Sequence, residues 1–335
     1  MRVGIVGAGF MGTTHLAGWA ETNAQVVGLV AETVEEARPL AAQSGVKIYP
    51  DLAALLPDVD VVDICTPTHL HYEMVLQAAA AGKQIICEKP LSRTVEHGQA
   101  MLAACSAAGV RLLVAHVVRF FPEYAQAQKL VAAGQIGRPG VLRLARGSYR
   151  PKKPVGNWFL DERKSGGILM DLMVHDYDYA RWIAGDVDSV FARKIRLEEN
   201  ASVDYALVIL RHRDGALSHI AGAWAYPPPT FRTRFEIAGD AGLIEFDSDD
   251  TAPIKNLILK SAGADAPDVA LPSSPTSENP YTTQIKEFYN AITEDRPARI
   301  TAGDGLAAVQ IALAALESAE SGKAVRLETL REVQP

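Results

Sequence analysis

Two residues capable of acid–base chemistry, Asp171 and His175, lie four positions apart in a largely apolar run. The run predicts a helix, and residues at i and i+4 share one face of a helix. A carboxylate beside an imidazole raises the pKa of the imidazole toward working pH and makes it a general base. Oxidation of an alcohol needs such a base, because the hydroxyl loses its proton as its carbon loses a hydride. An Asp–His pair that only stabilises the helix, or a histidine hydrogen-bonded in a core, produces the same pattern.

Two further polar stretches follow apolar runs that predict buried strands. One is Thr66-Pro67 with His71, and the other is Glu88-Lys89-Pro90. Because the carboxyl ends of parallel strands meet at one edge of a sheet, both stretches are expected at the ligand-binding edge. The Lys89 ammonium would point at a substrate oxygen, with its pKa tuned by burial and charge, and a cis bond to Pro90 would fix its approach. An ion pair at a solvated strand end would also place Glu88 beside Lys89.

A glycine-rich turn, GAGFMG at residues 7–12, follows the apolar run that opens the sequence and precedes a predicted helix. The first glycine permits a tight turn, the second lets the backbone approach a pyrophosphate, and the third lets helix and strand pack closely. The helix N-terminus adds free N–H groups and a partial positive charge for phosphates. The turn predicts a dinucleotide site, although a βα turn without a ligand fits the same spacing. Its expected binding residues are Gly7, Gly9, Phe10, Met11 and Gly12.

An acidic residue about 20 positions beyond such a turn binds the ribose hydroxyls in NAD sites. Glu32 stands at that distance from Gly12, just past the second predicted strand. Between Val26 and Ala37 the sequence has no lysine or arginine to receive a 2′-phosphate. These observations favour NAD, while the nearby Arg38 keeps NADP open. Beyond the glycine turn, the expected cofactor contacts are this acidic residue and residues of the two polar stretches at the strand ends. They are Glu32, Thr66, Pro67, His71, Glu88 and Lys89.

The elements that must position these residues follow two different patterns along the chain. Up to residue 120, short apolar runs alternate with helical patterns, which predicts βαβ units and a doubly wound parallel sheet of the Rossmann type. Beyond residue 138, strand-like runs joined by short turns predict an antiparallel meander, interrupted by one helix at about 167–184. We expect a dinucleotide-binding domain at 1–120. At 121–335 we expect an α+β domain with a large open, mostly antiparallel sheet for substrate binding and oligomerisation.

The composition is that of a globular protein, with 335 residues, 48% of them hydrophobic and 22% charged. The formal net charge of −7 gives no electrostatic footprint for nucleic acid or an anionic membrane. No apolar window is long enough for a membrane span. The three cysteines, Cys65, Cys87 and Cys105, lack C-x-x-C spacing, which argues against a disulfide framework and a zinc site. We expect reduced thiols, no metal and a cytoplasmic location.

Over nearly its whole length the chain resembles the glucose–fructose oxidoreductase, inositol dehydrogenase and rhizopine-catabolism family (Gfo/Idh/MocA). The resemblance rests on the glycine turn, Thr66-Pro67 with His71, AGK at 81–83 before Glu88-Lys89-Pro90, Gly166-Gly167 before Asp171 and His175, and SGKAV at 321–325. It implies a catalytic trio in which His175 exchanges the hydroxyl proton, Lys89 holds or polarises the reacting oxygen, and Asp171 orients the substrate or the histidine. It also implies substrates that are sugars, cyclic polyols or their keto forms, and a homodimer or homotetramer formed through the C-terminal sheet.

One position departs from the family pattern. In most NAD-using members the ribose-binding acid directly ends the second strand, where Ala31 stands, so Glu32 comes one place late and NADP is not excluded. The resemblance is also compatible with further substrate contacts, in which Trp158 packs on the cofactor and Arg119 or Asn157 bonds sugar hydroxyls. The additional substrate-binding candidates are His116, Arg119, Tyr149, Asn157, Trp158 and Tyr226. A basic cluster is expected to be a solvated rim, with an acidic sugar or phosphate as the alternative; it comprises Arg143, Arg146, Arg150, Lys152 and Lys153.

The sequence therefore predicts an NAD(P)-dependent oxidoreductase that passes hydride between the nicotinamide and a secondary hydroxyl or ketone of a sugar or cyclic polyol. One alternative is an NAD-dependent glycosidase or lyase that works through a transient keto-sugar and recycles its cofactor internally. Another is a non-enzymatic dinucleotide sensor, although a sensor has no need of an acid–base set.

Overall fold

The computed structural model describes residues 1–151, 158–196, 204–249 and 278–328. These residues form two compact units. Unit 1 comprises Met1–Phe120 with the described part of Ser274–Ala307, and unit 2 comprises the described parts of Phe121–Ser273 and Ala308–Leu330. The division predicted from the sequence placed all residues after 120 in a second domain. The structure instead assigns the described part of 274–307 to unit 1. Among the described residues, no helix combines the length and the apolarity needed to cross a membrane.

Unit 1 contains a six-stranded parallel sheet with the strand order β3-β2-β1-β4-β5-β6. The order reverses between β1 and β4, which opens a ligand crevice at the carboxyl ends of the strands in a Rossmann sheet. Strands such as β4 are buried at every position because helices cover both faces of a parallel sheet. The strands are β1 (Arg2–Val6), β2 (Gln25–Val30), β3 (Lys47–Ile48), β4 (Val61–Ile64), β5 (Gln84–Glu88) and β6 (Leu112–Ala115). The Rossmann prediction is confirmed, whereas the short β3 was not predicted.

Helix boundaries in unit 1 follow local signals in the sequence. α2 (Val34–Ser44) begins where the Thr33 hydroxyl accepts a hydrogen bond from Glu36 N, and it ends at Gly45 in the left-handed region. α5 (Val95–Ala108) is bounded by the same two residue types. The other helices are α1 (Phe10–Ala20), α3 (Leu52–Leu55), α4 (His71–Ala80) and α10 (Pro280–Thr293), with 3₁₀ turns η1 (Leu56–Asp58), η2 (Thr68–Leu70) and η3 (Val117–Phe120).

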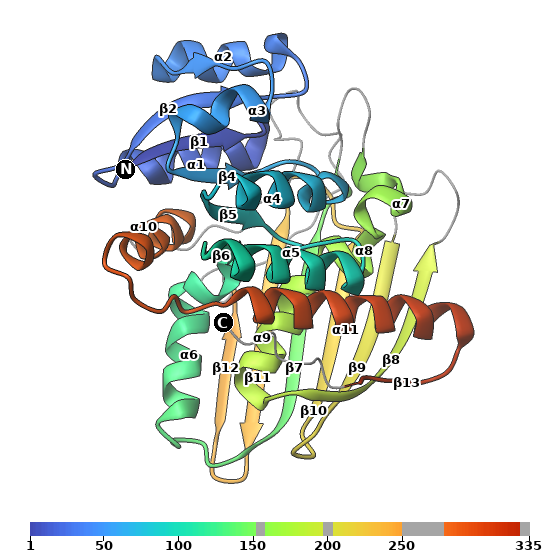
Figure 1. Cartoon of the computed structure of the whole chain (residues 1–335). Helices are drawn as coiled ribbons and strands as arrows, with labels where there is room; N and C mark the ends of the chain where they lie inside the picture. The colour runs from blue at the N-terminus through green and yellow to red at the C-terminus, as the bar shows by residue number, and fades with distance from the viewer. Residues whose placement is uncertain (152–157, 197–203, 250–277, 329–335) are drawn as a thin grey trace. The chain divides into compact units, whose positions relative to one another are not determined.

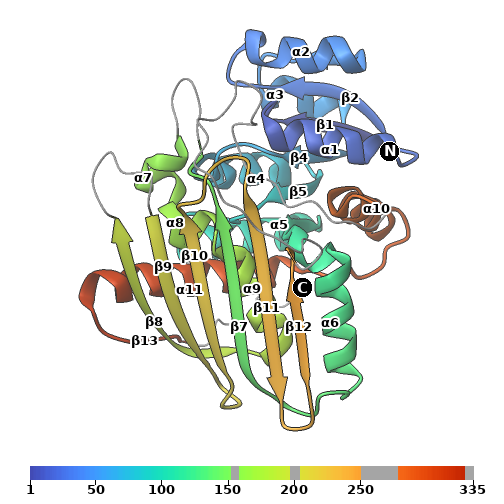
Figure 2. The same ribbon diagram turned by 180° about the vertical axis from the view of Figure 1, so that it is seen from behind.

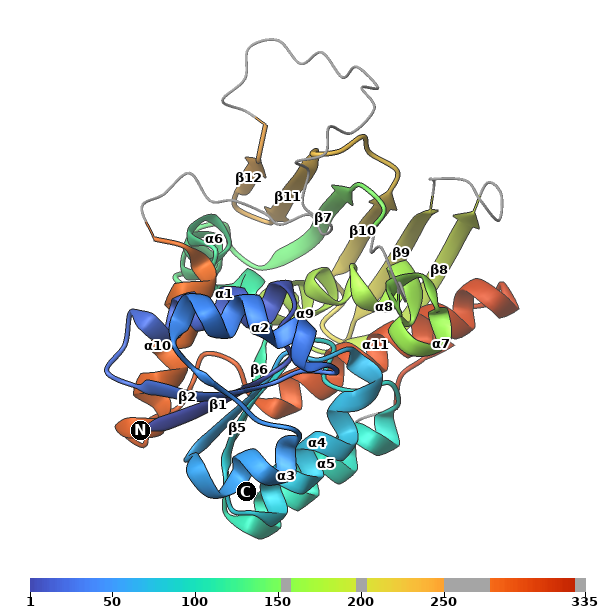
Figure 3. The same ribbon diagram turned by 90° about the horizontal axis from the view of Figure 1, so that it is seen from above.

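Helices cover both faces of the parallel sheet, with α1 and α10 on one side and α4 and α5 on the other (Figure 3). The core under α1 and α10 includes Trp19, Ile285 and Phe288, which are fully buried together with Val3 and Ile5 of β1. Each such side chain contributes roughly 1.5–3 kcal/mol on burial. This apolar contact explains why α10, which is distant in sequence, belongs to the first unit.

Unit 2 contains a seven-stranded mixed sheet with the order β12-β11-β7-β10-β9-β8-β13 (Figure 1). All neighbouring strands are antiparallel except β7 and β10, which pair in parallel with Val141 opposite Leu217. The predicted mostly antiparallel sheet is confirmed, but the predicted simple meander is wrong because β7 lies between β10 and β11. The strands are β7 (Pro139–Ser148), β8 (Val187–Arg196), β9 (Asp204–His212), β10 (Leu217–Trp224), β11 (Phe231–Gly239), β12 (Leu243–Asp247) and β13 (Val325–Arg326).

One face of this sheet is buried and the other is bare. In β9 every second residue is buried, as expected for a strand covered on one side. α9 and the later part of α11 lie against the buried face (Figure 1), and no described helix crosses the opposite face (Figure 2). The bare face, as we call it, carries the exposed apolar side chains of Ile195, Tyr205, Leu207 and Leu217. The helices of this part of the chain are α6 (Pro122–Ala132), α7 (Glu162–Ser165), α8 (Gly167–Asp171), α9 (Val174–Ala184) and α11 (Ala302–Ser321), with η4 (Trp158–Leu160).

The segment 167–184, predicted as a single helix, is broken between α8 and α9. At the break, Met173 N–H donates to the carbonyl of Ile168, five positions back, as in a π-bulge. Asp171 and His175 therefore lie on two different helices, and the prediction of one continuous helix through both residues is wrong. The sequence pattern missed the break because the apolar periodicity continues through it. Single-turn bulges of this kind are frequent at functional sites.

Candidate functional site

The glycine turn joins β1 to α1, and two of its glycines are required by the packing of unit 1 itself. Gly7 has a φ of +111°, and a Cβ on it would lie 2.5 Å from the carbonyl oxygen of Cys65. A Cβ on Gly12 would lie 1.9 Å from the carbonyl oxygen of Gly7. Both distances are well inside van der Waals contact, so neither position accepts a side chain unless the main chain moves.

Gly9 differs, because no described atom lies within 4 Å of the Cβ that it would carry. Its φ of −75° suits any residue. It caps α1, a helix of 11 residues, with no side-chain hydrogen bond to the first N–H groups. Packing of the described residues therefore does not explain why the N-cap residue lacks a side chain. A ligand that approaches the backbone closely, as a pyrophosphate does, explains it. Phe10, which follows, is 39% exposed, and Met11 lies in the same first turn.

Glu32 is an exposed residue two positions beyond the end of β2. The turn and this strand end are tied together, because Gly7 N donates to the carbonyl of Val30 over 2.7 Å. Arg38, the nearest basic residue along the chain, lies 3.6 Å from the carboxylate of Glu35. The surroundings of the strand end are therefore acidic, which suits ribose hydroxyls better than a 2′-phosphate.

His71 was expected to contact the cofactor, but its ring is fully buried. Its Nδ1 lies 2.9 Å from the carbonyl oxygen of Pro90, and its Nε2 lies 2.9 Å from that of Thr66. Burial lowers the pKa of His71, although the contacts with these carbonyls oppose the shift. Both ring nitrogens contact main-chain oxygens, so His71 braces the loop after β4 against the loop after β5. Thr66 and Pro67 are themselves half-buried at this edge.

Lys89 directly follows β5, is half-buried, and forms a cis peptide bond with Pro90, as predicted. The preceding residue, Glu88, is only 5% exposed. One oxygen of Glu88 accepts a hydrogen bond from Lys89 N over 3.0 Å, and the other lies 3.1 Å from Nε2 of His15. The predicted pairing of Glu88 with the Lys89 side chain at a solvated end is therefore replaced by internal contacts of a buried carboxylate.

His15 belongs to a polar cluster that the sequence analysis missed. Its Nδ1 lies 3.0 Å from both carboxylate oxygens of Asp63 and 3.3 Å from Sγ of Cys65. Trp19 Nε1 donates to the same carboxylate over 2.7 Å. The available signal was Asp63 itself, because an acidic residue inside an otherwise apolar strand requires a buried partner.

The cysteines are free thiols, as predicted. Burial raises the pKa of Cys65 to about 12 and that of Cys105 to about 11, and it also raises the pKa of Cys87. Thiols with raised pKa values are poor nucleophiles at neutral pH. The cysteines therefore offer no reactive group for chemistry.

In unit 2, Asp171 ends α8 with 7% of its surface exposed, and His175 lies half-buried in the first turn of α9. The next residue, Asp176, forms a buried bidentate ion pair with Arg146, with distances of 2.8 and 2.9 Å. Arg146 was expected at a solvated rim, and that expectation is wrong because every second residue of β7 faces the core. Arg143, three positions earlier and therefore on the other face of the strand, is exposed and pairs with Glu236.

The remaining substrate candidates have varied surroundings. His116 is fully buried after β6, and Tyr149 is buried after β7. Arg119 is 2% exposed; its guanidinium donates to the carbonyl of Arg299 over 3.1 Å and lies 3.4 Å from Asp304. These contacts favour a structural role for Arg119 over the predicted sugar contact. Trp158 is half-buried and stacks on Phe159 with a centroid distance of 4.1 Å. Asn157, Lys152 and Lys153 lie outside the described residues.

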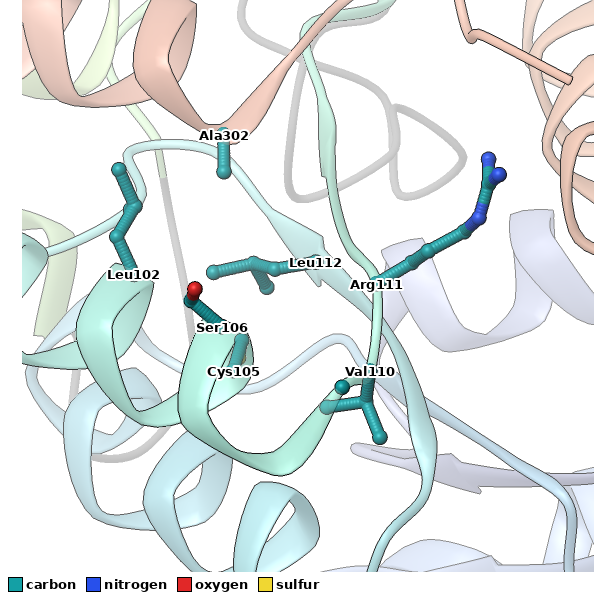
Figure 4. Close-up of a pocket in the computed structure, with 8 residues that line it drawn as sticks. Leu102, Cys105, Ser106, Val110, Arg111, Leu112 and Ala302 are labelled. Atoms are coloured by element: carbon teal, nitrogen blue, oxygen red, sulfur yellow. The ribbon is translucent and has the colours of Figure 1, made fainter. Parts of the chain in front are cut away.

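A pocket of unit 1 lies where the end of α5 and the start of β6 meet the first residue of α11 (Figure 4). Its lining is mainly apolar and contains none of the predicted site residues. The lining residues are Leu102, Cys105, Ser106, Gly109, Val110, Arg111, Leu112 and Ala302. We therefore place the candidate site at the glycine turn and the strand ends rather than in this pocket.

Comparisons of the sequence with protein families match both parts of the chain. The family described as "Oxidoreductase family, NAD-binding Rossmann fold" (GFO_IDH_MocA) matches residues 1–116. The "GFO/IDH/MocA C-terminal domain" matches residues 124–245. Myo-inositol 2-dehydrogenase of Thermotoga maritima is 30% identical over 98% of this chain and 99% of its own length.

Solved structures are similar over the same extent. GenD2 from gentamicin A biosynthesis, solved in complex with NAD, has a TM-score of 0.86 at 26% identity and covers 98% of this chain and 97% of its own. Levoglucosan dehydrogenase in complex with NADH and levoglucosan has a TM-score of 0.83 at 26% identity and covers 98% of this chain and 100% of its own. The similarity thus includes both units and is not limited to the dinucleotide fold.

Proposed function

Because the chain belongs to the Gfo/Idh/MocA oxidoreductase family, we propose that it transfers a hydride between NAD and a secondary hydroxyl or ketone of a sugar or cyclic polyol. The activities named for its relatives, myo-inositol 2-dehydrogenase and levoglucosan dehydrogenase, lie in this class. The observation that carries the proposal is the glycine turn, in which position 9 is a glycine although no described atom lies within 4 Å of the Cβ that another residue would carry there. That turn lies at the ligand-binding edge of a parallel sheet with the Rossmann strand order.

The cofactor is NAD, and the residues around the turn fit it. The N-terminus of α1 and the bare Gly9 suit the pyrophosphate, and the exposed carboxylate of Glu32 suits the ribose hydroxyls. NAD supplies the hydride acceptor at its nicotinamide when it is bound. Proton transfer and orientation of the substrate are left to the protein.

We assign these tasks to three side chains. His175 takes the hydroxyl proton as the alcohol is oxidised and returns it in the reverse direction. Lys89 holds the reacting oxygen through its ammonium group, and Asp171 orients the substrate or His175. The assignment is supported by the burial of Asp171 and by the position of Lys89 directly after a strand end. The bulge between Asp171 and His175 supports it further, since such bulges occur often at functional sites.

A panel of sugars, inositols and uronic acids with NAD and NADP, followed at 340 nm, tests the proposal. We expect NADH to accumulate with at least one substrate, and we expect kcat/KM to be higher with NAD than with NADP. His175→Ala should lower kcat by about 100-fold or more, the usual scale for loss of a general base, and should leave NADH binding intact. His97→Ala is the matched control, because His97 is exposed on α5 and stacks on Tyr72 at 4.0 Å.

Three outcomes would contradict the proposal. Full activity of His175→Ala would remove the assigned base. Product formed without a change at 340 nm would favour internal recycling of the cofactor in a lyase or glycosidase. Binding of NADH without turnover of any substrate in the panel would favour a sensor.

We also propose that the bare face joins copies of the chain into a homodimer or homotetramer. Four exposed apolar side chains, on strands β8 to β10, support this, because apolar residues left exposed on one face of a sheet are typical of an interface. Light scattering at micromolar concentration should give a mass of two or four chains of 36.0 kDa, and a monomeric mass would contradict the proposal.

A further inference from the structure

One fully buried imidazole connects two neighbouring strands of unit 1. His15 projects from α1; Asp63 comes from β4 and Glu88 from β5, which pair in parallel. Nδ1 of His15 contacts the first carboxylate at 3.0 Å, and Nε2 lies 3.1 Å from the second. His15 Nε2 and the facing Glu88 oxygen lie at ion-pair distance, 3.1 Å, although neither atom has a hydrogen bond of regular geometry in the described part of the chain.

Both ring nitrogens of His15 face carboxyl oxygens, so a doubly protonated ring presents one N–H group to each side. Burial lowers the pKa of His15, but the charge of Asp63 and the contact with Cys65 outweigh it, and the pKa lies well above its usual range. From α1, Trp19 donates to Asp63, and from β4 the Cys65 thiol is uncharged because its pKa is about 12. The imidazolium thus lies between two buried carboxylates.

Glu88 also contacts the main chain of Lys89, the proposed catalytic lysine. While one of its oxygens faces His15, the other accepts the hydrogen bond from Lys89 N over 3.0 Å. The carboxyl group of Glu88 therefore contacts His15 through one oxygen and the main chain of Lys89 through the other. His15 itself is only three residues beyond Gly12, on the helix that begins at the glycine turn.

We propose that His15 is a positioning residue for the reaction, which sets the backbone of Lys89 through the carboxylate of Glu88. The proposal rests on the proposed function in so far as Lys89 holds the reacting oxygen. It also implies that the helix that presents its N-terminus to the cofactor and the loop that presents Lys89 are joined by one ionic contact. Displacement of a catalytic group by about 1 Å can cost about 100-fold in rate.

A metal site is the competing explanation for this cluster. The donor atoms of His15, Asp63 and Cys65 lie close enough together to hold one ion. Zinc requires a neutral imidazole and a thiolate, so it would have to displace the proton that Asp63 favours on His15 and the proton that burial favours on Cys65. Metal analysis of the purified protein separates the two explanations, since one bound zinc per chain would overturn the positioning role.

The decisive variants are His15→Gln and His15→Asn, which are both neutral and differ in reach. Glutamine places its amide near the position of Nε2 and keeps the contact with Glu88, whereas asparagine places it near Nδ1 and keeps only the contact with Asp63. The first readout is amide hydrogen exchange at Lys89, which needs no substrate. The second is kcat with the best substrate of the sugar panel, with NADH affinity and the free energy of unfolding measured in parallel. His97→Asn, on the exposed side of α5, is the matched control.

In His15→Asn we expect exchange at Lys89 to be at least about 10-fold faster and kcat to fall by about 10- to 100-fold, with NADH affinity little changed. His15→Gln should stay within about 5-fold of the wild type in both readouts. A merely structural role would make the two variants alike in activity and in stability. If His15→Asn does not fold, Glu88→Gln replaces it, because a neutral amide oxygen is a weaker acceptor for Lys89 N–H.

Equal effects of the glutamine and asparagine variants, or unchanged exchange at Lys89 in His15→Asn and Glu88→Gln, would overturn the proposal. If exchange follows the expected order but the wild type turns over no substrate, the proposed function fails while the link from His15 to Lys89 stands. If the wild type is active, Lys89→Ala is inactive and His15→Asn is fully active, the proposed function stands and the positioning role fails.

Discussion

Alanine substitutions at Gly9 and Gly12 should have different effects. Gly12→Ala should lower the stability of unit 1, whereas Gly9→Ala should weaken dinucleotide binding. At Gly12 a Cβ would lie 1.9 Å from the Gly7 carbonyl oxygen, whereas at Gly9 it would meet no described atom within 4 Å. Gly12→Ala must therefore move the main chain of the turn. Gly9→Ala requires no movement of the protein, and its φ of −75° is compatible with alanine.

The expected magnitudes follow from these distances. Gly12→Ala should lower the free energy of unfolding by about 3 kcal/mol, at the upper end of overpacking costs, because the colliding atom is backbone and cannot rotate away. In Gly9→Ala the loss of a favourable N-cap residue and the lower entropy of the unfolded chain offset each other, so stability should stay within about 1 kcal/mol of the wild type. The added methyl group should nevertheless weaken NADH binding by at least about 10-fold, or about 1.4 kcal/mol, because it occupies the approach to the pyrophosphate.

Urea denaturation followed by circular dichroism, without cofactor, measures the first quantity, and titration of NADH fluorescence measures the second. Wild-type affinity for NADH in Gly9→Ala would refute the placement of the pyrophosphate at this turn. Wild-type stability of Gly12→Ala would show that the close approach between Gly12 and Gly7 is not as the structure has it.

Two further predictions concern unit 2. Asp176→Asn, which removes the charge that forms a bidentate ion pair with the buried Arg146, should lower the free energy of unfolding by about 3–5 kcal/mol. The matched control Asp186→Asn removes the 55% exposed partner of Arg181 and should cost about 0–1 kcal/mol; equal losses in urea denaturation would contradict the comparison. His212 is buried, lies 2.7 Å from the carbonyl of Gly185 and 2.8 Å from the hydroxyl of Ser218, and burial lowers its pKa below 6.5. The unfolded chain therefore binds this proton first, so stability should fall as the pH drops below about 6.5 toward the lowered pKa. Urea denaturation at about pH 7.5 and 5.5 should show a smaller fall in His212→Asn, which keeps a donor for Gly185 but does not titrate; an equal fall in both proteins would rule out the role of His212.

Much of unit 1 was predictable because its signals are local. Thr33 and Gly45 bound α2 as the sequence predicts, since a side-chain cap and a left-handed glycine act within a few residues. The glycine turn was predictable for the same reason, because a tight turn and a close approach of two backbones both require glycine at fixed positions in the sequence. The distinction between glycines required by packing and the one left bare for a ligand needed coordinates, since the colliding atom at Gly7 belongs to Cys65, far along the chain.

The polar contacts inside the units were not predictable from local patterns. Arg146 and Asp176 are 30 positions apart, and His15 and Asp63 are 48 positions apart. A charged residue in a strand is expected to face solvent unless a helix or strand that packs on it offers a partner. The sequence did not show that α9 packs on this strand, so Arg146 was predicted to lie at a solvated rim. The break between Asp171 and His175 escaped prediction because a bulge alters hydrogen bonding without altering apolar periodicity.

By itself the sequence determined the alternation of strands and helices, the glycine turn, and the residue types available for acid–base chemistry, because each depends on periodicity or on the conformational freedom of single residues. Only the tertiary structure decided that α10 returns to the first unit, that β7 and β10 pair in parallel, and that His15 lies between Asp63 and Glu88. These features arise from contacts between residues distant in the chain. A buried polar group is stable only with a hydrogen-bond or ion-pair partner, and the fold determines which residues become those partners.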